Sequence, residues 1–284
     1  MTKTIDTLVN DMENVILGLG GWDNAITEYL AESIAKVAEN RFSKPQEPRG
    51  YLSLSAVGDH CERSLWYKVN MADKGEPLGA EALGTFFYGD LLEAFIIAVV
   101  KAAGHTVEGE QERLDVHGVK GHRDLIIDGM TVDVKSASSY GFQKFADHNL
   151  REDDPFGYIS QLSSYVYAGK DDPKVTDKNR GAFLAVKKDR FKLALDIYDF
   201  TEELKTKEQE IEHKKAVVAG DIPEDRLPPV PQSKTSPNLK LDTKCGYCQF
   251  RKLCWPEART FIYSSGPVFL AEVVKEPNVP EIIE

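Results

Sequence analysis

GHRDLIIDGMTVDVKSA, residues 121–137, predicts a β-hairpin around which the rest of the fold can be arranged. Residues 121–128 and 131–137 alternate in polarity, and Asp128-Gly129 between them is a strong signal for a two-residue turn. With that turn, Leu125 faces Val132 and Asp124 faces Asp133, with Cβ atoms about 4.5–5.5 Å apart. The segment therefore predicts a hairpin that carries two neighbouring carboxylates.

Two carboxylates at that distance repel each other, and a buried pair is costly unless a cation lies between them. Hard oxygen ligands favour Mg²⁺ or Mn²⁺ over zinc. Lys135 follows Asp133 by two residues and projects from the same face of the strand. It could hold a water molecule or a developing negative charge beside the metal. The alternative is that Asp124 and Asp133 are solvated side chains on an exposed strand face.

Three polar residues outside the hairpin favour the metal site. Glu93 lies on a strongly apolar predicted helix, residues 84–103, where an unpaired carboxylate would be expensive. Gln161 and Tyr165 are four residues apart on a helix predicted from Pro155 to about Ala168, so they share one of its faces.

The order of the predicted elements indicates an α/β fold with a mixed sheet flanked by helices. Helical spacing predicts a helix over 24–41, and Ser53 or Ser55 can cap a helix carrying Cys61. Strands are expected over 111–117, 121–128, 131–137, 181–187 and 191–198, and a further helix over 202–218.

The chain resembles the RecB-like branch of the PD-(D/E)xK nuclease superfamily through four segments in order. They are Glu93, residues 121–124, residues 133–135 and residues 161–165. The resemblance implies a restriction-endonuclease-like fold with a helical N-terminal region. It makes Glu93, Asp124, Asp133 and the Val134 carbonyl metal ligands, Lys135 the residue that orients the attacking water, and Gln161 and Tyr165 residues that orient the site and DNA.

Two positions depart from the family pattern. Many relatives carry a histidine four residues after the glycine of the helical motif, where this chain has Glu93 after Gly89. Arg123 precedes Asp124 where the signature has proline. The first departure bears on metal preference more than on activity.

Four cysteines form the second group. Cys245, Cys248 and Cys254 lie within ten residues, and Cys61 lies far upstream. This is the number of ligands of a tetrahedral metal site. The pattern resembles the [4Fe–4S] staple of Cas4-like and AddB-type nucleases, in which the cluster would be structural and would pin the C-terminal segment. A structural Zn²⁺ site and unlinked buried cysteines are the alternatives.

We expect four regions along the chain. They are an N-terminal helical region (1–45), a nuclease core (46–222), a proline-rich arm with the cysteine segment (223–256) and an acidic C-terminal tail (257–284). The prolines of 223–237 argue against regular structure there. Residues 272–284 have the composition of a disordered or partner-binding tail.

Composition narrows the possible locations and partners. The net charge of −11 over 284 residues argues against a protein that coats nucleic acid non-specifically. There is no uninterrupted apolar run of about 18 residues, so we expect no membrane span. The N-terminus lacks the pattern of a secretory signal, and four cysteines then suggest a reducing compartment. We expect the cytoplasm of a bacterium or of a phage-infected cell.

The resemblance implies a metal-dependent DNA exonuclease that acts on DNA ends or single strands in recombination, repair or phage DNA processing. The chain has no Walker motif, so any unwinding would come from a helicase or recombination partner. Two other functions remain open. One is a non-catalytic DNA-binding or scaffold module of the same fold, and the other is a restriction-type endonuclease.

Overall fold

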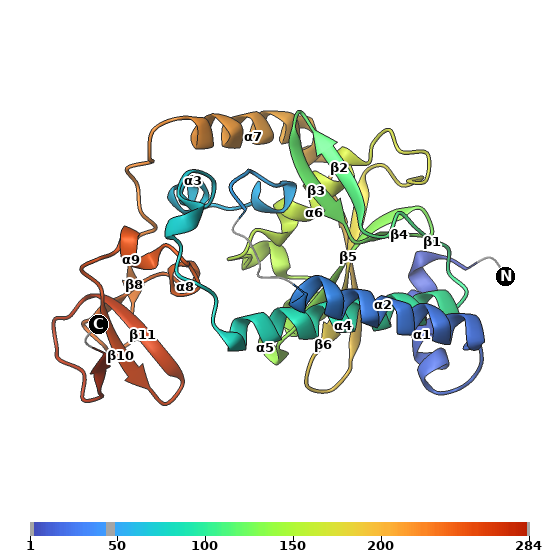
Figure 1. Cartoon of the computed structure of the whole chain (residues 1–284), viewed down its shortest axis with the longest axis horizontal. Coiled ribbons are helices and arrows are strands. Elements are labelled where there is room, and N and C mark those ends of the chain that lie inside the picture. The colour runs from blue at the N-terminus through green and yellow to red at the C-terminus, as the bar shows by residue number, and fades with distance from the viewer. Residues whose placement is uncertain (1–2, 44–48, 283–284) are drawn as a thin grey trace. The chain divides into compact units, whose positions relative to one another are not determined.

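The structure is a computed structural model that describes residues 3–43 and 49–282 (Figure 1). The chain divides into two compact units. Unit 1 comprises Met1–Glu47, Leu52–Gly58 and Gly79–His213, and unit 2 comprises Pro48–Tyr51, Asp59–Leu78 and Lys214–Glu284. Helix α7 (Thr201–Ala219) contains one of the boundaries between them.

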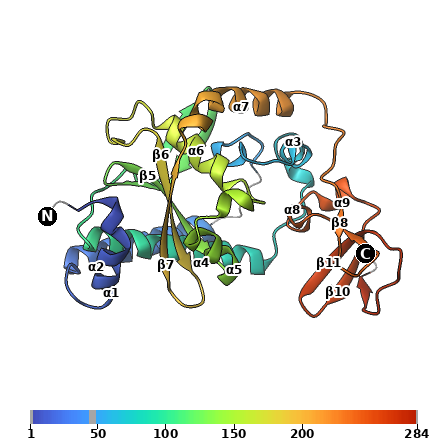
Figure 2. The ribbon, with the colours of Figure 1, turned by 180° about the vertical axis from the view of Figure 1, so that it is seen from behind.

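Unit 1 is built on a five-stranded mixed sheet (Figures 1 and 2). The strand order is β1-β4-β5-β6-β7, with β5 parallel to β6 and the other neighbours antiparallel. The predicted mixed sheet is therefore confirmed. The strands are β1 (Val107–Glu108), β4 (Leu125–Ile127), β5 (Met130–Ala137), β6 (Arg180–Lys187) and β7 (Leu193–Asp199).

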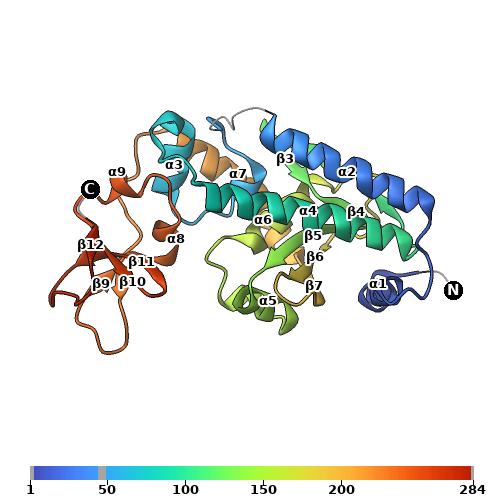
Figure 3. The ribbon, with the colours of Figure 1, turned by 60° about the horizontal axis from the view of Figure 1, so that its bottom comes forward.

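Helices cover both faces of this sheet because alternate strand residues point to opposite sides. Val132 and Val134 pack in one core with α1 and α4, whereas Phe183 and Ala185 pack in a second core with α5 and α6. Helix α2 lies along α4 (Figure 3). The helices are α1 (Leu8–Ile16), α2 (Asn24–Phe42), α4 (Ala80–Ala102), α5 (Ser139–Ala146) and α6 (Tyr158–Ala168), with short 3₁₀ turns η1 (Ile5–Thr7), η2 (Leu54–Ala56) and η4 (Leu150–Glu152).

The β4–β5 hairpin has the predicted turn and register. Asp128 and Gly129 have φ values of 50° and 81°, as a type I′ turn requires at both central residues. Ile127 faces Met130, and Leu125 faces Val132. This part of the prediction is confirmed.

The prediction of one strand over residues 121–128 is wrong. Strand β4 begins at Leu125, and the preceding β3 (Val119–Arg123) pairs with β2 (Glu112–Val116) in a separate two-stranded sheet. His122 therefore faces Arg113. Asp124 lies between the two strands and belongs to neither pairing.

Two predicted helix starts also differ from the structure. Helix α6 begins at Tyr158 instead of Pro155, because the Asp154 carboxylate accepts the N–H groups of Tyr158 and Ile159 and so caps the helix. Helix α3 (Glu62–Asn70) begins after Cys61, and Ser53 precedes only the 3₁₀ turn η2.

Helix α4 is long and apolar enough to cross a membrane by length and composition, and it is the one such helix in the described ranges. Its C-terminal half, however, contributes Ile96, Val99 and Val100 to the core of unit 1, where they are fully buried. Core packing explains the apolar character of this C-terminal half.

Unit 2 contains α3, the end of α7 and a five-stranded sheet of order β12-β10-β11-β9-β8. The prediction of a disordered tail is wrong for the described part of 272–284, because Glu281–Ile282 forms an edge strand of this sheet. Arg259 pairs with Glu276 and Glu281, which explains the acidic composition. The other elements of unit 2 are η3 (Ala72–Lys74), β8 (Val230–Pro231), β9 (Leu239–Lys240), α8 (Thr243–Gly246), α9 (Arg251–Cys254), β10 (Arg259–Tyr263), β11 (Gly266–Glu272) and β12 (Glu281–Ile282).

Candidate active site

Asp124 is the residue before β4. It lies beside the part of β5 that extends beyond the Leu125–Val132 pair. Its Oδ2 accepts the backbone N–H of Val134 at 2.8 Å, and its backbone carbonyl accepts the N–H of Gln111 at 2.8 Å. Just beyond the Leu125–Val132 pair, the Asp124 carboxylate therefore accepts the N–H that a backbone carbonyl would accept in a continuous pair of strands. Val134, whose carbonyl the resemblance assigns to the metal, thereby fixes Asp124 through its N–H.

Asp133 and Lys135 project from β5 toward the α5–α6 side of the sheet. Asp133 is 1% exposed, and its Oδ2 lies 2.6 Å from the Lys135 ammonium. Beyond that ion pair, Oδ2 has no hydrogen-bond donor in the described part of the chain. The Lys135 ammonium also lies 4.7 Å from the centre of the Tyr158 ring.

Glu93 reaches the same site from α4. The helix approaches β5 closely at Gly89, where a Cβ would lie 3.2 Å from the Ser136 hydroxyl. Glu93 lies one turn further along α4, and its Oε1 accepts a hydrogen bond from Gln111 Nε2 at 2.6 Å. Burial raises the pKa of Glu93 to about 7, against the hydrogen bond from Gln111.

Helix α6 contributes Gln161 and Tyr165 from one face, as their spacing predicts. Gln161 Nε2 lies 3.4 Å from Asp133 Oδ1 and 3.2 Å from the Tyr165 hydroxyl. Tyr165 is 3% exposed. The structure therefore brings all six predicted side chains of the nuclease site into one neighbourhood.

The electrostatics of the site favour a cation. Burial raises the pKa of Asp124 well above its ordinary value, and the charges of Asp133 and Glu93 raise it further. Burial also raises the pKa of Asp133, although Lys135 opposes this. Burial alone would lower the pKa of Lys135, but Asp133 and Asp124 hold it above its ordinary value. One ammonium therefore faces three crowded carboxyl groups whose ionised forms are disfavoured, and a bound cation would favour these ionised forms.

The residue types suit a hard divalent cation, since three carboxylates and a backbone carbonyl offer only oxygen ligands. As placed, no three His, Cys, Asp or Glu side chains among residues 3–43 and 49–282 form a metal-holding group. Asp133 forms an ion pair with Lys135. Asp124 accepts the backbone N–H of Val134, and Glu93 accepts a hydrogen bond from the Gln111 side chain. These contacts satisfy the carboxylates that a cation would otherwise bridge, and the donor set itself fits Mg²⁺ or Mn²⁺.

Two further residues of this site have no place in the sequence prediction. Gln111 lies in a loop and reaches Glu93 only through the tertiary fold, so no sequence pattern identifies it. Tyr158 precedes Gln161 by three residues and therefore lies on the same helical face, which its spacing could have indicated. It lies under the Lys135 ammonium.

Arg123, the residue in place of the family's proline, is fully buried behind Asp124. Its guanidinium pairs with Glu112 and Asp172. Lys174 pairs with Glu112 as well, at 2.7 Å. Arg123 therefore anchors the end of β3, and with it the position of Asp124, through ion pairs.

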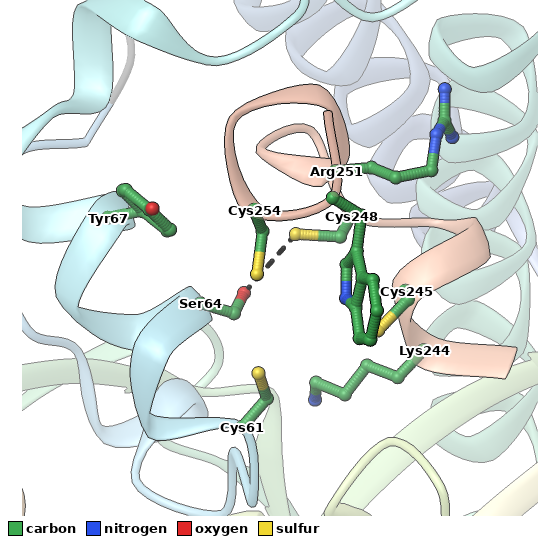
Figure 4. Close-up of a pocket in the computed structure, with 9 residues that line it drawn as sticks. Cys61, Ser64, Tyr67, Lys244, Cys245, Cys248, Arg251 and Cys254 are labelled. Carbon is green, nitrogen blue, oxygen red and sulfur yellow. Dashed lines mark hydrogen bonds between the residues drawn. The ribbon is translucent and has the colours of Figure 1, made fainter. Parts of the chain in front are cut away.

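The four cysteines all belong to unit 2 and line a single pocket (Figure 4). Cys61 precedes α3, Cys245 lies in α8, and Cys254 ends α9. All four are free thiols. The Ser64 hydroxyl of α3 lies 3.5 Å from Cys248 Sγ. The other lining residues are Ser64, Tyr67, Lys244, Arg251 and Trp255.

The thiols of this pocket influence one another. Burial raises the pKa of Cys245 to about 12, and Cys61 and Cys248 contribute to the rise. Burial also raises the pKa of Cys254, opposed by Arg63 and Arg226. Clustered thiols without disulfides are a suitable donor set for a thiophilic metal or an iron–sulfur cluster, which would favour the thiolate forms. Trp255 Nε1 is buried and has no hydrogen-bond partner among the described residues, and a cluster sulfur could accept its N–H.

Comparison with known proteins gives a family match over most of the chain. The PD-(D/E)XK nuclease superfamily matches residues 24–255, a range that contains every candidate residue named above. No curated protein matches the chain. A solved structure described as "Crystal structure of SSO0001" is 17% identical, with 81% of this chain and 96% of that chain aligned and a TM-score of 0.40. A similarity of that size carries no argument about function.

Proposed function

Because the chain belongs to the PD-(D/E)XK nuclease superfamily, we propose that it is a Mg²⁺- or Mn²⁺-dependent DNA exonuclease of the RecB- and Cas4-like branch. Its five-stranded mixed sheet flanked by helices is consistent with the restriction-endonuclease-like fold of that superfamily. The observation that carries the proposal is the convergence of Glu93, Asp124 and Asp133 beside Lys135 at one end of the β4–β5 hairpin.

The side chains have distinct roles in this proposal. Glu93, Asp124, Asp133 and the Val134 carbonyl would hold the metal. A bound Mg²⁺ or Mn²⁺ ion would polarise the scissile phosphate and lower the pKa of a bound water. Lys135, fixed by its ion pair with Asp133 and by the Tyr158 ring, would orient the attacking water. Gln161 and Tyr165 would hold Asp133 and the DNA backbone in place.

We further propose that the cysteine pocket of unit 2 holds a structural [4Fe–4S] cluster. Its support is the presence of four free thiols in one pocket, together with the buried Trp255 N–H, which no group in the described part of the chain accepts. The protein purified without oxygen would then contain about four irons per chain. One zinc and no iron would assign the pocket to a structural Zn²⁺ ion, with no consequence for the nuclease site.

The proposed setting follows from the same features. A pocket of four reduced thiols suits a reducing compartment, which supports a cytoplasmic location in a bacterium or a phage-infected cell. The substrate would be DNA ends or single strands. A helicase or recombination protein would supply any unwinding.

A digest of end-labelled linear DNA and of circular DNA of the same sequence, with Mg²⁺ or Mn²⁺, tests this function. We expect release of short labelled products from the linear DNA and survival of the circle, and no cleavage after chelation. Cutting of the circle would favour a restriction-type endonuclease. Binding of both DNAs without cleavage would favour a scaffold module.

A further inference from the structure

Asp59 forms a buried ionic cluster beside the cysteine pocket, within unit 2. It is 4% exposed, and its carboxylate pairs with Lys68 and Lys244, each at 2.9 Å. Its Oδ1 also accepts the backbone N–H of Cys61 at 2.9 Å. Both oxygens of the carboxylate are therefore engaged.

Two of these contacts connect segments that carry cysteines. The Asp59 side chain fixes the backbone of Cys61 directly. Lys244, the residue before Cys245 in α8, binds the same Oδ1 atom. The N–H of Lys244 in turn bonds to Asp242, which caps α8. A single carboxylate oxygen of Asp59 thus contacts both Cys61 and Lys244, the residue before the first downstream cysteine.

Lys244 differs from Lys68 in its surroundings. Lys244 lines the cysteine pocket, and its side chain is 13% exposed. Lys68 lies on α3, is 45% exposed and is not part of the pocket lining. Both lysines neutralise Asp59, but only Lys244 also holds a cysteine-bearing helix and places a positive charge beside the thiols. Figure 4 shows Lys244 beside the four cysteines.

We propose that Asp59 and Lys244 are positioning residues that hold Cys61 and Cys245 together for metal ligation, and that the Lys244 ammonium offsets part of the charge of the bound thiolates. The inference rests on the four-cysteine site proposed above and is independent of whether iron or zinc occupies it. Because a thiolate site with four cysteines is strongly anionic, loss of the Lys244 charge should weaken metal binding beyond any loss of stability.

The test uses the full-length protein, stripped of metal by a chelator under reducing conditions and titrated with Co²⁺ alone. Thiolate-to-cobalt absorption in the near ultraviolet reports ligation, and thermal unfolding of each stripped variant is measured in parallel. We expect Lys244→Gln to weaken Co²⁺ binding about 10-fold or more. Lys244→Arg, which keeps the charge, should restore most of the affinity.

Lys68→Gln is the matched control, since it removes the other ion pair of Asp59 at the same distance. We expect it to lower the unfolding temperature less than Lys244→Gln does, because Lys68 is more exposed, and to change the Co²⁺ affinity little. Asp59→Asn should weaken binding at least as much as Lys244→Gln. If that variant does not fold, the two lysine variants still decide the question.

Three results would overturn the inference. They are equal Co²⁺ affinity in Lys244→Gln and the unsubstituted protein, equal losses in Lys68→Gln and Lys244→Gln, and no rescue by Lys244→Arg. Absence of any cobalt–thiolate absorption in the unsubstituted protein would overturn the four-cysteine site itself. DNA cleavage with Mg²⁺ is measured separately, so a failure of the nuclease proposal leaves the titration interpretable.

Discussion

Asp124 and Asp133 are held close together at a cost to stability. Asp133 is buried and Asp124 is half-buried, the charge of Asp133 raises the pKa of Asp124, and Lys135 supplies one positive charge against them. A folded protein tolerates such crowding where a ligand needs it, and binding sites are often less stable than they could be. The metal-free site should therefore gain stability when one of its charges is removed.

We expect Asp124→Asn to raise the unfolding temperature of the chelator-treated protein at pH 8 by at least about 2 °C. The amide oxygen can still accept the Val134 N–H. Because the folded-state pKa of Asp124 lies above its unfolded value, its ionisation costs stability as the pH rises through the folded-state pKa, and the cost is absent below the unfolded value. The gain should therefore vanish near pH 4, which scanning calorimetry across pH would measure.

Asp225→Asn, at an exposed position, is the control and should leave the unfolding temperature unchanged at both pH values. Mg²⁺ should stabilise the unsubstituted protein but not Asp124→Asn, and cleavage should fall by more than about 10²-fold. A lower unfolding temperature for Asp124→Asn at pH 8 would contradict the electrostatic account of this site.

Lys135 is the residue whose loss should separate chemistry from folding. Lys135→Ala should reduce the initial cleavage rate by about 10²–10³-fold, since a positioned donor to the reacting centre contributes that much. It also leaves the buried Asp133 without its ion-pair partner, and removal of one partner of a buried pair costs about 3–5 kcal/mol of unfolding free energy. End-label release with saturating Mg²⁺, together with circular dichroism, measures both effects. Lys192→Ala, an exposed control, should change neither, and full activity in Lys135→Ala would remove it from the mechanism.

At the level of single residues, local geometry made part of this site predictable. Asp128-Gly129 fixes the turn, and the turn fixes the facing of Leu125 and Val132, which places Asp124 near Asp133. Gln111 was not predictable, because its contact with Glu93 depends on the tertiary path of the loop before β2. The ion pairs of the buried Arg123 with Glu112 and Asp172 were not predictable either, because they also depend on the tertiary fold.

Among the elements, α6 depends on a close backbone contact at its start. Gly157 has φ of 74°, and a Cβ there would lie 2.2 Å from the Gly58 carbonyl oxygen. The predicted start at Pro155 failed because sequence propensity cannot anticipate this contact or the Asp154 cap. Since α6 carries Gln161 and Tyr165, its start also sets the position of two candidate site residues.

Gly157→Ala and Gly118→Ala separate backbone strain from steric conflict. Gly118 has φ of 84° with open space around it, so its substitution should cost about 1–2 kcal/mol of unfolding free energy. Gly157→Ala adds a backbone clash and should cost about 1–3 kcal/mol more. Urea denaturation of both variants measures the difference. Equal costs would show that Gly58 can move away freely, contrary to the close packing seen here.

The C-terminal strands show how composition can mislead at this scale. Residues 272–282 are acidic and proline-containing, which favours disorder, yet Glu276 and Glu281 are neutralised by Arg259. The flanking segments Arg259–Tyr263 and Gly266–Glu272 are a hairpin pair whose alternating residues could have indicated strands. Arg259 lies in β10, so the composition of residues 272–282 alone does not reveal the ion-pair partner of these glutamates.

For the molecule as a whole, the division into units does not follow the order of the sequence. Unit 2 combines residues 59–78 with residues 214–284, although the strands of the unit 1 sheet lie between these two segments in the sequence. The one sequence feature that hinted at this was the separation of Cys61 from Cys245. The four thiols and the Asp59–Lys244 ion pair lie wholly within unit 2, whereas Glu93, Asp124 and Asp133 lie wholly within unit 1.

This separation predicts that the two proposed metal sites stabilise different parts of the chain. Removal of the metal that we propose the cysteines bind should increase hydrogen exchange in residues 59–78 and 214–282 and leave the β4–β6 region protected. Chelation of Mg²⁺ should do the reverse. A ligand present at 100 times its dissociation constant contributes about 2.7 kcal/mol to the unit that binds it, enough to separate two unfolding transitions. Cys61→Ser should reproduce the first pattern with Mg²⁺-dependent cleavage retained at low temperature, and loss of protection across both units together would mean that they unfold as one.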